Sequence, residues 1–249
     1  MRERDRRIQQ RGRELVDLAV RHLPQEFEVT GDADAWPFIA AALLSRMTTT
    51  LRSILELQPA EREADAGILV RSLFEHAVHL AWLGADPCAT RIEEWRKHDL
   101  ASRLTADTDA RKHAIELFTE AARANVKAQV DRMQGKKLVL ASLAAAADGH
   151  WAGTLPGMGA SPEVNSFRGL YAVLYRNYSG IAHPTYRGLN RVVEDLGATR
   201  RRVGLETEYE GSGPCGIGTV IFALGLYVTA ITLGWPQIAE IEAIFERHP

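Results

Sequence analysis

Residues 171–187, which read YAVLYRNYSGIAHPTYR, gather the side chains best suited to chemistry on a phosphate. Arg176 and His183 stand seven positions apart, so in a helix they would lie two turns apart, about 10.5 Å of rise, on nearly the same face. Metal-free cleavage of RNA needs a base for the ribose 2′-hydroxyl and a cation for the charge that develops on the phosphorane. His183 and Arg176 could supply both. In the structural alternative, Arg176 pairs with a buried acid and His183 caps a helix end.

The segment RNYSGIAH, residues 176–183, resembles the motif of the HEPN superfamily of α-helical domains, in which Arg is often followed by a polar residue and then by His after four to six residues. The resemblance implies a metal-independent ribonuclease that works as a dimer with its two motifs facing one cleft. It would make His183 the general base and Arg176 the stabiliser of the transition state, and Asn177 would position the phosphate. Tyr178 and Ser179, inside the motif, are supporting candidates.

A wider resemblance covers about residues 60–190. The segments RSLFEHAVHLAWL, DPCATRIEEW, HWAGTLPGMG and LYRNYSGIAHP occur in this order, and they resemble a family of uncharacterised bacterial proteins that is known only as a domain of unknown function. This resemblance implies an all-α cytosolic protein and brings no established activity.

Arg71, Glu75 and His79 follow one another at four-residue intervals in an otherwise apolar segment, and Trp82 extends the stripe. In a helix, Arg71 and Glu75 can pair. One hypothesis makes them the second wall of the same cleft, with Glu75 orienting Arg176 or His183. The other makes them an internal ion pair that fixes the helix register.

Potential metal ligands also occur in this part of the chain, but neither the paired Glu-x-x-His motif of di-iron bundles nor the HExxH zinc motif is present. The potential ligands are Glu75, His76, His79, Glu94, His98 and Asp99. We therefore expect no metal and no cofactor. Trp95 and Trp151 are expected to be packing anchors.

The composition does not favour binding to nucleic acid as a whole, because the formal net charge is −2. RNA binding would depend on local positive charge, for which Arg187 and Arg191 are the candidates, with residues 200–202 continuing a basic patch. Neighbouring acidic residues dilute this patch, and a solvated surface is the alternative. The chain has only two cysteines, which give no disulfide framework. Its charged N-terminus lacks the apolar core of a signal peptide. Both features predict a cytoplasmic protein.

Apolar periodicity predicts an all-α fold, a helical bundle with long antiparallel helices. A charged helix is expected in residues 1–30, followed by a single all-α, HEPN-like domain over 31–249. Within that domain, helices over about 35–57 and 61–84 should form an antiparallel hairpin. A long helical region from 89 to 133 should break near 105–109, a short helix should cover 137–147, and Ser161 should cap the helix that carries the motif. Residues 188–210 are expected to form an irregular insert or a small hairpin.

Residues 215–235 contain no charge and are long enough to span a bilayer. A buried central helix of a bundle has the same composition, and the acidic flanks give no positive-inside signal, so a membrane span is not the preferred interpretation.

The sequence thus leaves three functions open. The first is a homodimeric HEPN-like ribonuclease of the toxin or phage-defence type, with RNA as substrate and an antitoxin or regulatory protein as partner. The second is a catalytically silent helical binding module. The third is a protein anchored to a membrane through residues 215–235.

Overall fold

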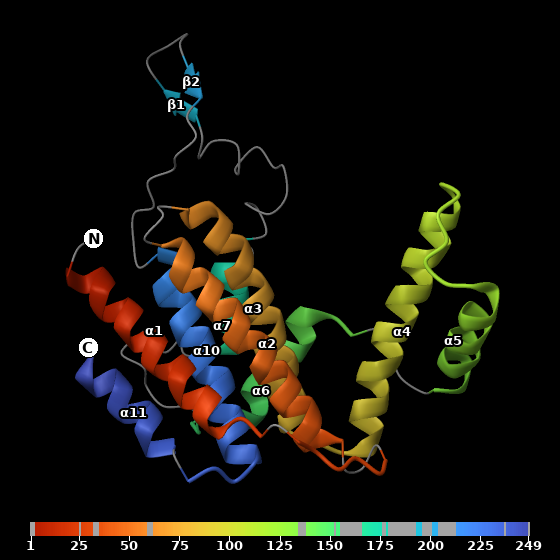
Figure 1. Cartoon of the computed structure of the whole chain (residues 1–249), viewed down its shortest axis with the longest axis horizontal. Coiled ribbons are helices and arrows are strands. Elements are labelled where there is room, and N and C mark those ends of the chain that lie inside the picture. The colour runs from red at the N-terminus through yellow and green to blue at the C-terminus, as the bar shows by residue number, and fades with distance from the viewer. Residues whose placement is uncertain are drawn as a thin grey trace.

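The computed structural model is an all-α helical bundle with one small hairpin (Figure 1). The described part of the chain comprises residues 3–24, 26–31, 35–58, 62–133, 138–151, 153–154, 166–175, 178, 193–195, 201–203, 213–236 and 238–248. The elements are α1 (Glu3–His22), α2 (Trp36–Leu57), α3 (Glu63–Gly84), α4 (Ala89–Arg111), α5 (Glu120–Arg132), α6 (Leu140–Trp151), α7 (Phe167–Leu170), the π-helix η2 (Tyr171–Tyr175), β1 (Val193–Asp195), β2 (Arg201–Val203), α10 (Gly213–Thr232) and α11 (Ile238–Arg247).

The centre of the bundle is α10, which contacts α3, α2, α1 and α11. Most of its residues are buried. The polar groups inside it are satisfied locally, because the hydroxyls of Thr219 and Thr229 donate to the carbonyls four residues earlier at 2.8 and 2.9 Å. The uncharged stretch 215–235 therefore supplies the core of the fold in this structure.

Two described helices, α2 and α10, are long and apolar enough to cross a membrane. The most apolar window of α10 is 78% buried inside the fold and that of α2 is 61% buried. A core helix of a soluble protein passes the same length and composition test.

The predicted antiparallel hairpin of residues 35–84 is confirmed as α2 and α3, which pack along each other. The small hairpin expected near 188–210 is also present: β1 pairs antiparallel with β2, with Val193 opposite Val203. The N-terminal helix was predicted too, and α1 buries Leu15, Leu18 and Ala19 against the bundle.

The predicted break at 105–109 is wrong, because α4 continues to Arg111 and the turn to α5 follows it. The reason is Asp107, which is fully buried inside α4 and accepts hydrogen bonds from the backbone N–H groups of Leu117 and Phe118 at 3.2 and 3.1 Å. Its other oxygen faces Arg111 at 2.8 Å and Arg123 at 3.0 Å. Asp107 thus organises the turn from within the helix and does not break it.

Helix α6 extends further than predicted and ends at Trp151, whose indole Nε1 donates to the carbonyl of Ala81 at 2.9 Å. This bond joins α6 to α3 and confirms Trp151 as a packing anchor. Trp95 is partly buried against the same core. The predicted cap, Ser161, lies outside the described residues, and the N-cap of α7 is Ser166.

Candidate functional site

The candidate site follows α7, a four-residue helix whose N-terminal N–H groups donate hydrogen bonds to two side chains. The carboxylate of Asp148 on α6 accepts hydrogen bonds from the backbone N–H groups of Phe167 and Arg168 at 2.7 and 2.8 Å. The hydroxyl of Ser166 accepts from the N–H of Gly169 at 2.9 Å. These bonds satisfy N–H groups that a helix start leaves unpaired, and they fix the direction in which η2 continues.

η2 has π-helical geometry, whereas the sequence predicted an ordinary α-helix through these residues. A π turn uses more residues per turn than an α-helix. The π turn comprises residues 171–175. π-Helical turns occur frequently at functional sites.

Tyr175, the last residue of η2, forms a closed cluster with Arg71 and Glu75 of α3. The phenol of Tyr175 donates to Oε1 of Glu75 at 3.0 Å and accepts from Nη2 of Arg71 at 3.2 Å. Nε of Arg71 donates to the same Oε1 at 3.2 Å. The predicted pair between Arg71 and Glu75 is therefore present, and Tyr175 completes it.

Rings surround this cluster on its apolar side. The guanidinium carbon of Arg71 lies 5.1 Å from the centre of the Tyr175 ring. Tyr171 stacks on Tyr175 with centroids 5.1 Å apart and an interplanar angle of 16°, and Phe74 lies 6.0 Å away on the α3 side. Such contacts add to the burial energy of the rings, so η2 is fixed against α3 by polar and aromatic contacts together.

The cluster shifts two pKa values upward. The pKa of Tyr175 is raised because the phenol is partly buried and because it faces the Glu75 carboxylate. Burial by itself would lower the pKa of Arg71, but the hydrogen bonds and charges of Tyr175 and Glu75 outweigh it and the pKa rises. Both groups therefore keep their protons at neutral pH, and both donate hydrogen bonds to Oε1 of Glu75.

Several predicted site residues lie outside the described residues: Arg176, Asn177, Ser179, His183, Arg187 and Arg191. Tyr178 is described and is buried in the core at 1% exposed. The described part of the site therefore consists of Arg71, Glu75 and Tyr175. Tyr175 was not among the predicted site residues, although its position directly before the Arg-Asn pair was a signal for it.

His79 does not join this cluster, although it lies one turn beyond Glu75 on α3. Its pKa is lowered to about 4, first because the ring is buried and second because His98 and His76 lie near it. Its Nδ1 is buried and has no hydrogen-bond partner among the residues that the structure describes. At the far end of the stripe, the guanidinium carbon of Arg91 of α4 lies 5.2 Å from the centre of the Trp82 ring. The residues of the predicted stripe therefore have different partners at its two ends and do not form one site.

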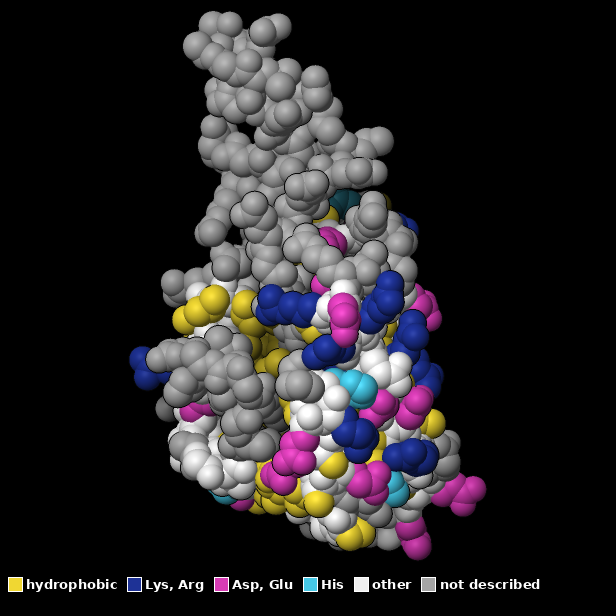
Figure 2. All heavy atoms as spheres, turned by 90° about the vertical axis from the view of Figure 1, so that its left-hand side faces the viewer, with side chains coloured by type: hydrophobic (Ala, Val, Ile, Leu, Met, Phe, Trp, Pro, Cys, Tyr) yellow, Lys and Arg dark blue, Asp and Glu magenta, His cyan; other side chains and the backbone are white. Residues whose placement is uncertain are grey.

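Among the described residues, no group of three or more His, Cys, Asp and Glu side chains is arranged to hold a metal ion. The face that carries α1 and α11 shows basic and acidic side chains intermingled, without a continuous basic field (Figure 2). Ion pairs such as Arg247–Glu14 at 2.8 Å and Arg21–Glu240 at 3.2 Å account for part of this pattern. On this face the described surface resembles an ordinary solvated surface more than an RNA-binding one.

In a comparison with known families, a family model described as "Family of unknown function (DUF5677)" matches residues 38–199. These residues include α2 from its third residue on, α3 to α7, η2 and β1. No curated protein and no solved structure matches the chain.

Proposed function

The chain belongs to this family of unknown function, and from that premise we propose that it is a metal-independent endoribonuclease that acts on RNA as a homodimer. The proposed general base is His183 and the proposed stabiliser of the transition state is Arg176. Asn177 would position the phosphate, and Arg187 and Arg191 would bind phosphates of the RNA. A toxin or phage-defence role, held in check by an antitoxin or regulatory protein, would suit such an activity.

The observation that supports this proposal is the anchoring of Tyr175, the residue directly before Arg176 in the sequence. Its hydroxyl and its ring are held by Arg71 and Glu75. Catalytic groups act only when supporting residues hold them near the reacting atoms. The residue directly before the motif therefore has a side chain that is fixed on both its polar and its apolar side.

The reaction follows from the chemistry of the two side chains. Neutral His183 would take the proton of a ribose 2′-hydroxyl, and the resulting oxygen would attack the adjacent phosphorus. Arg176 would bind the phosphate oxygens as negative charge grows on them. The bond from phosphorus to the 5′-oxygen would break and that oxygen would take a proton from solvent. The products are a 2′,3′-cyclic phosphate and a 5′-hydroxyl.

The direct test is cleavage of structured and unstructured RNAs by the purified full-length chain in EDTA. We expect cyclic phosphate ends, and we expect His183→Ala to lower the rate by about 100-fold or more. Arg176→Ala should be equally damaged, and Arg176→Lys should retain part of the rate. The matched control is His113→Ala, which changes an exposed histidine of the α4–α5 turn. Equal cleavage by His183→Ala and the unmodified chain would refute the proposal.

A second candidate, a catalytically silent binding module, is favoured by the mutual hydrogen bonds of Arg71, Glu75 and Tyr175. Such a cluster also suits a purely structural link between η2 and α3. The same experiment separates the two: RNA that is retained in a binding assay and remains uncut across the panel would favour the binding module.

A further inference from the structure

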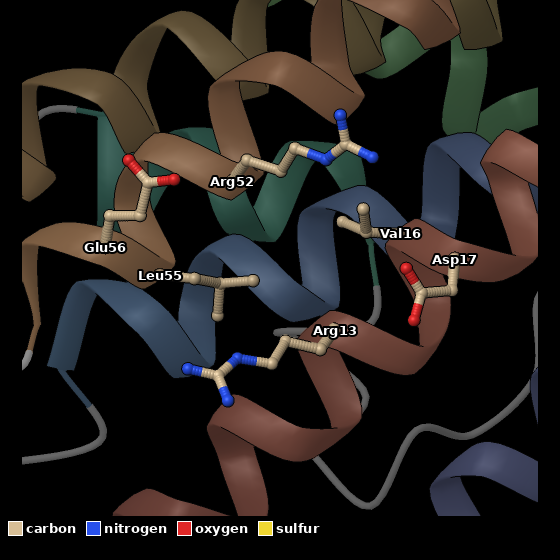
Figure 3. Close-up of a pocket in the computed structure, with 6 residues that line it drawn as sticks. All are labelled: Arg13, Val16, Asp17, Arg52, Leu55 and Glu56. Atoms are coloured by element: carbon tan, nitrogen blue, oxygen red, sulfur yellow. The ribbon is translucent and has the colours of Figure 1, made fainter.

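A shallow groove lies between α1 and α2, and Figure 3 shows the six side chains that line it. Its volume is about 490 Å³. The floor is apolar and closed, since Val16 and Leu55 are only 3% and 4% exposed. The walls are four exposed charged side chains: Arg13 and Asp17 of α1, and Arg52 and Glu56 of α2.

The four charges alternate in sign around the groove. Each helix presents an arginine and, one turn later, an acid, and the two helices pass the groove in opposite directions (Figure 3). Arg13 and Glu56 therefore lie at one end of the groove, and Asp17 and Arg52 lie at the other. Within the described residues none of the four makes an ion pair or hydrogen bond. A phosphate or carboxylate ligand would meet two acids here, so a free anion does not fit this groove.

Exposed apolar side chains continue the same face beyond one end of the groove. Val20 is 44% exposed and follows Val16 by one turn of α1. Phe38 is 48% exposed and lies on the stripe of α2 that leads through positions 42, 45 and 49 to Arg52. Because the helices are antiparallel, Val20 and Phe38 both lie on the Asp17–Arg52 side of the charges.

We propose that this face is the contact between two copies of the chain, related by a two-fold axis that runs along the groove. Such an axis lays α1 of each copy over α2 of the other. Each end of the groove in one copy then faces the same end of the groove in the other copy. Arg13 then meets Glu56 of the partner subunit, and Asp17 meets the partner's Arg52, each pair occurring twice. The same operation places Val20 and Phe38 of both copies toward one end of the contact. An isologous interface requires self-complementarity of this kind.

The charges and the apolar residues have different parts in this contact. Exposed ion pairs contribute little affinity but select the register and orientation. Val20 and Phe38 supply the apolar surface whose burial favours association. The proposed function includes a homodimer, and this contact would be its interface. The contact does not depend on ribonuclease activity. Helix α1 also precedes the matched residues 38–199, so half of this surface lies outside the family match.

The test is a charge exchange, followed by sedimentation or light scattering of the full-length chain over a range of concentrations. We expect the unmodified chain to be a dimer. Asp17→Arg alone and Arg52→Asp alone should each weaken the dimer at least about tenfold, because two like-charged contacts appear per interface. The double variant D17R/R52D should return the dissociation constant to within a few-fold of the starting value. Phe38→Ser should weaken the dimer without changing its response to salt.

The matched control exchanges Asp99 and Arg103, an exposed pair one turn apart on α4, and should leave dimerisation unchanged. Circular dichroism verifies that each variant is folded. A chain that remains monomeric at about 100 μM, or a dimer that Asp17→Arg does not weaken, would overturn the proposal. His183→Ala should dimerise normally, so failure of this interface and failure of the ribonuclease are separate results.

Discussion

Tyr175 of η2 donates its phenolic hydrogen to Glu75 of α3 at 3.0 Å, across 100 residues of sequence. This bond ties the segment that leads into the Arg-Asn motif to a core helix of the bundle. Arg71 contacts both partners, so the three side chains form one unit and not three independent pairs.

Removal of either end of this bond should lower stability by about 1 kcal/mol, because each change leaves partly buried polar groups with fewer partners. We expect Tyr175→Phe and Glu75→Ala to be non-additive by about 0.5–1 kcal/mol in a double-mutant cycle measured by urea unfolding. Glu3→Gln, which removes an exposed pair with Arg7, is the control and should change stability by only a few tenths of a kcal/mol. Strict additivity would show that the cluster is not a unit.

The buried His79 should make stability depend on pH. Its pKa is lowered from 6.5 to about 4 in the folded protein, so between these values the unfolded chain binds a proton that the folded protein does not. Stability should therefore fall as pH decreases from about 6.5 to 4, by about 3 kcal/mol from this residue. His79→Gln should flatten the curve over this range relative to the unmodified chain, whereas His113→Gln should not. Parallel curves for all three proteins would rule out this assignment.

Asp107 should control the turn between α4 and α5. Burial by itself raises the pKa of Asp107, but hydrogen bonds from Arg111 and from the N–H groups of Phe118 and Leu117 outweigh it and the pKa falls below its usual value. Asp107→Asn removes the charge that these donors share. We expect faster hydrogen exchange at Leu117 and Phe118, on the order of tenfold. Asp109→Asn, at an exposed pair with Lys112, should leave both amides unchanged.

Trp151 should stabilise the junction of α6 and α3 through its indole. Trp151→Phe removes the Nε1 hydrogen bond to Ala81 and part of a side chain that is 3% exposed. The free energy of unfolding should fall by about 1–2 kcal/mol. Trp95→Phe, which changes a partly buried tryptophan, should have a smaller effect in the same denaturation assay. An equal loss at both positions would mean that the hydrogen bond contributes little.

Much of the bundle could be predicted from the sequence because apolar periodicity over twenty residues leaves few alternatives. The hairpin of α2 and α3, the apolar α10 and the Arg71–Glu75 pair all follow from local spacing. The position of the α4–α5 turn does not follow from local spacing. It depends on the Asp107 carboxylate accepting hydrogen bonds from the N–H groups of Leu117 and Phe118, ten and eleven residues away. The role of Tyr175 depends on the π-helical turn of η2, and this turn has no local signature in YAVLY.

The position of α10 has a consequence for how the chain is synthesised. This helix is the centre of the bundle, yet it is made from residues 213–232 of a 249-residue chain. Until it leaves the ribosome, the apolar faces of α1, α2 and α3 lack the element against which they pack. We therefore expect the native core to close only after α10 has left the ribosome, and nascent chains that stop before residue 213 to depend on chaperones that shield exposed apolar helices.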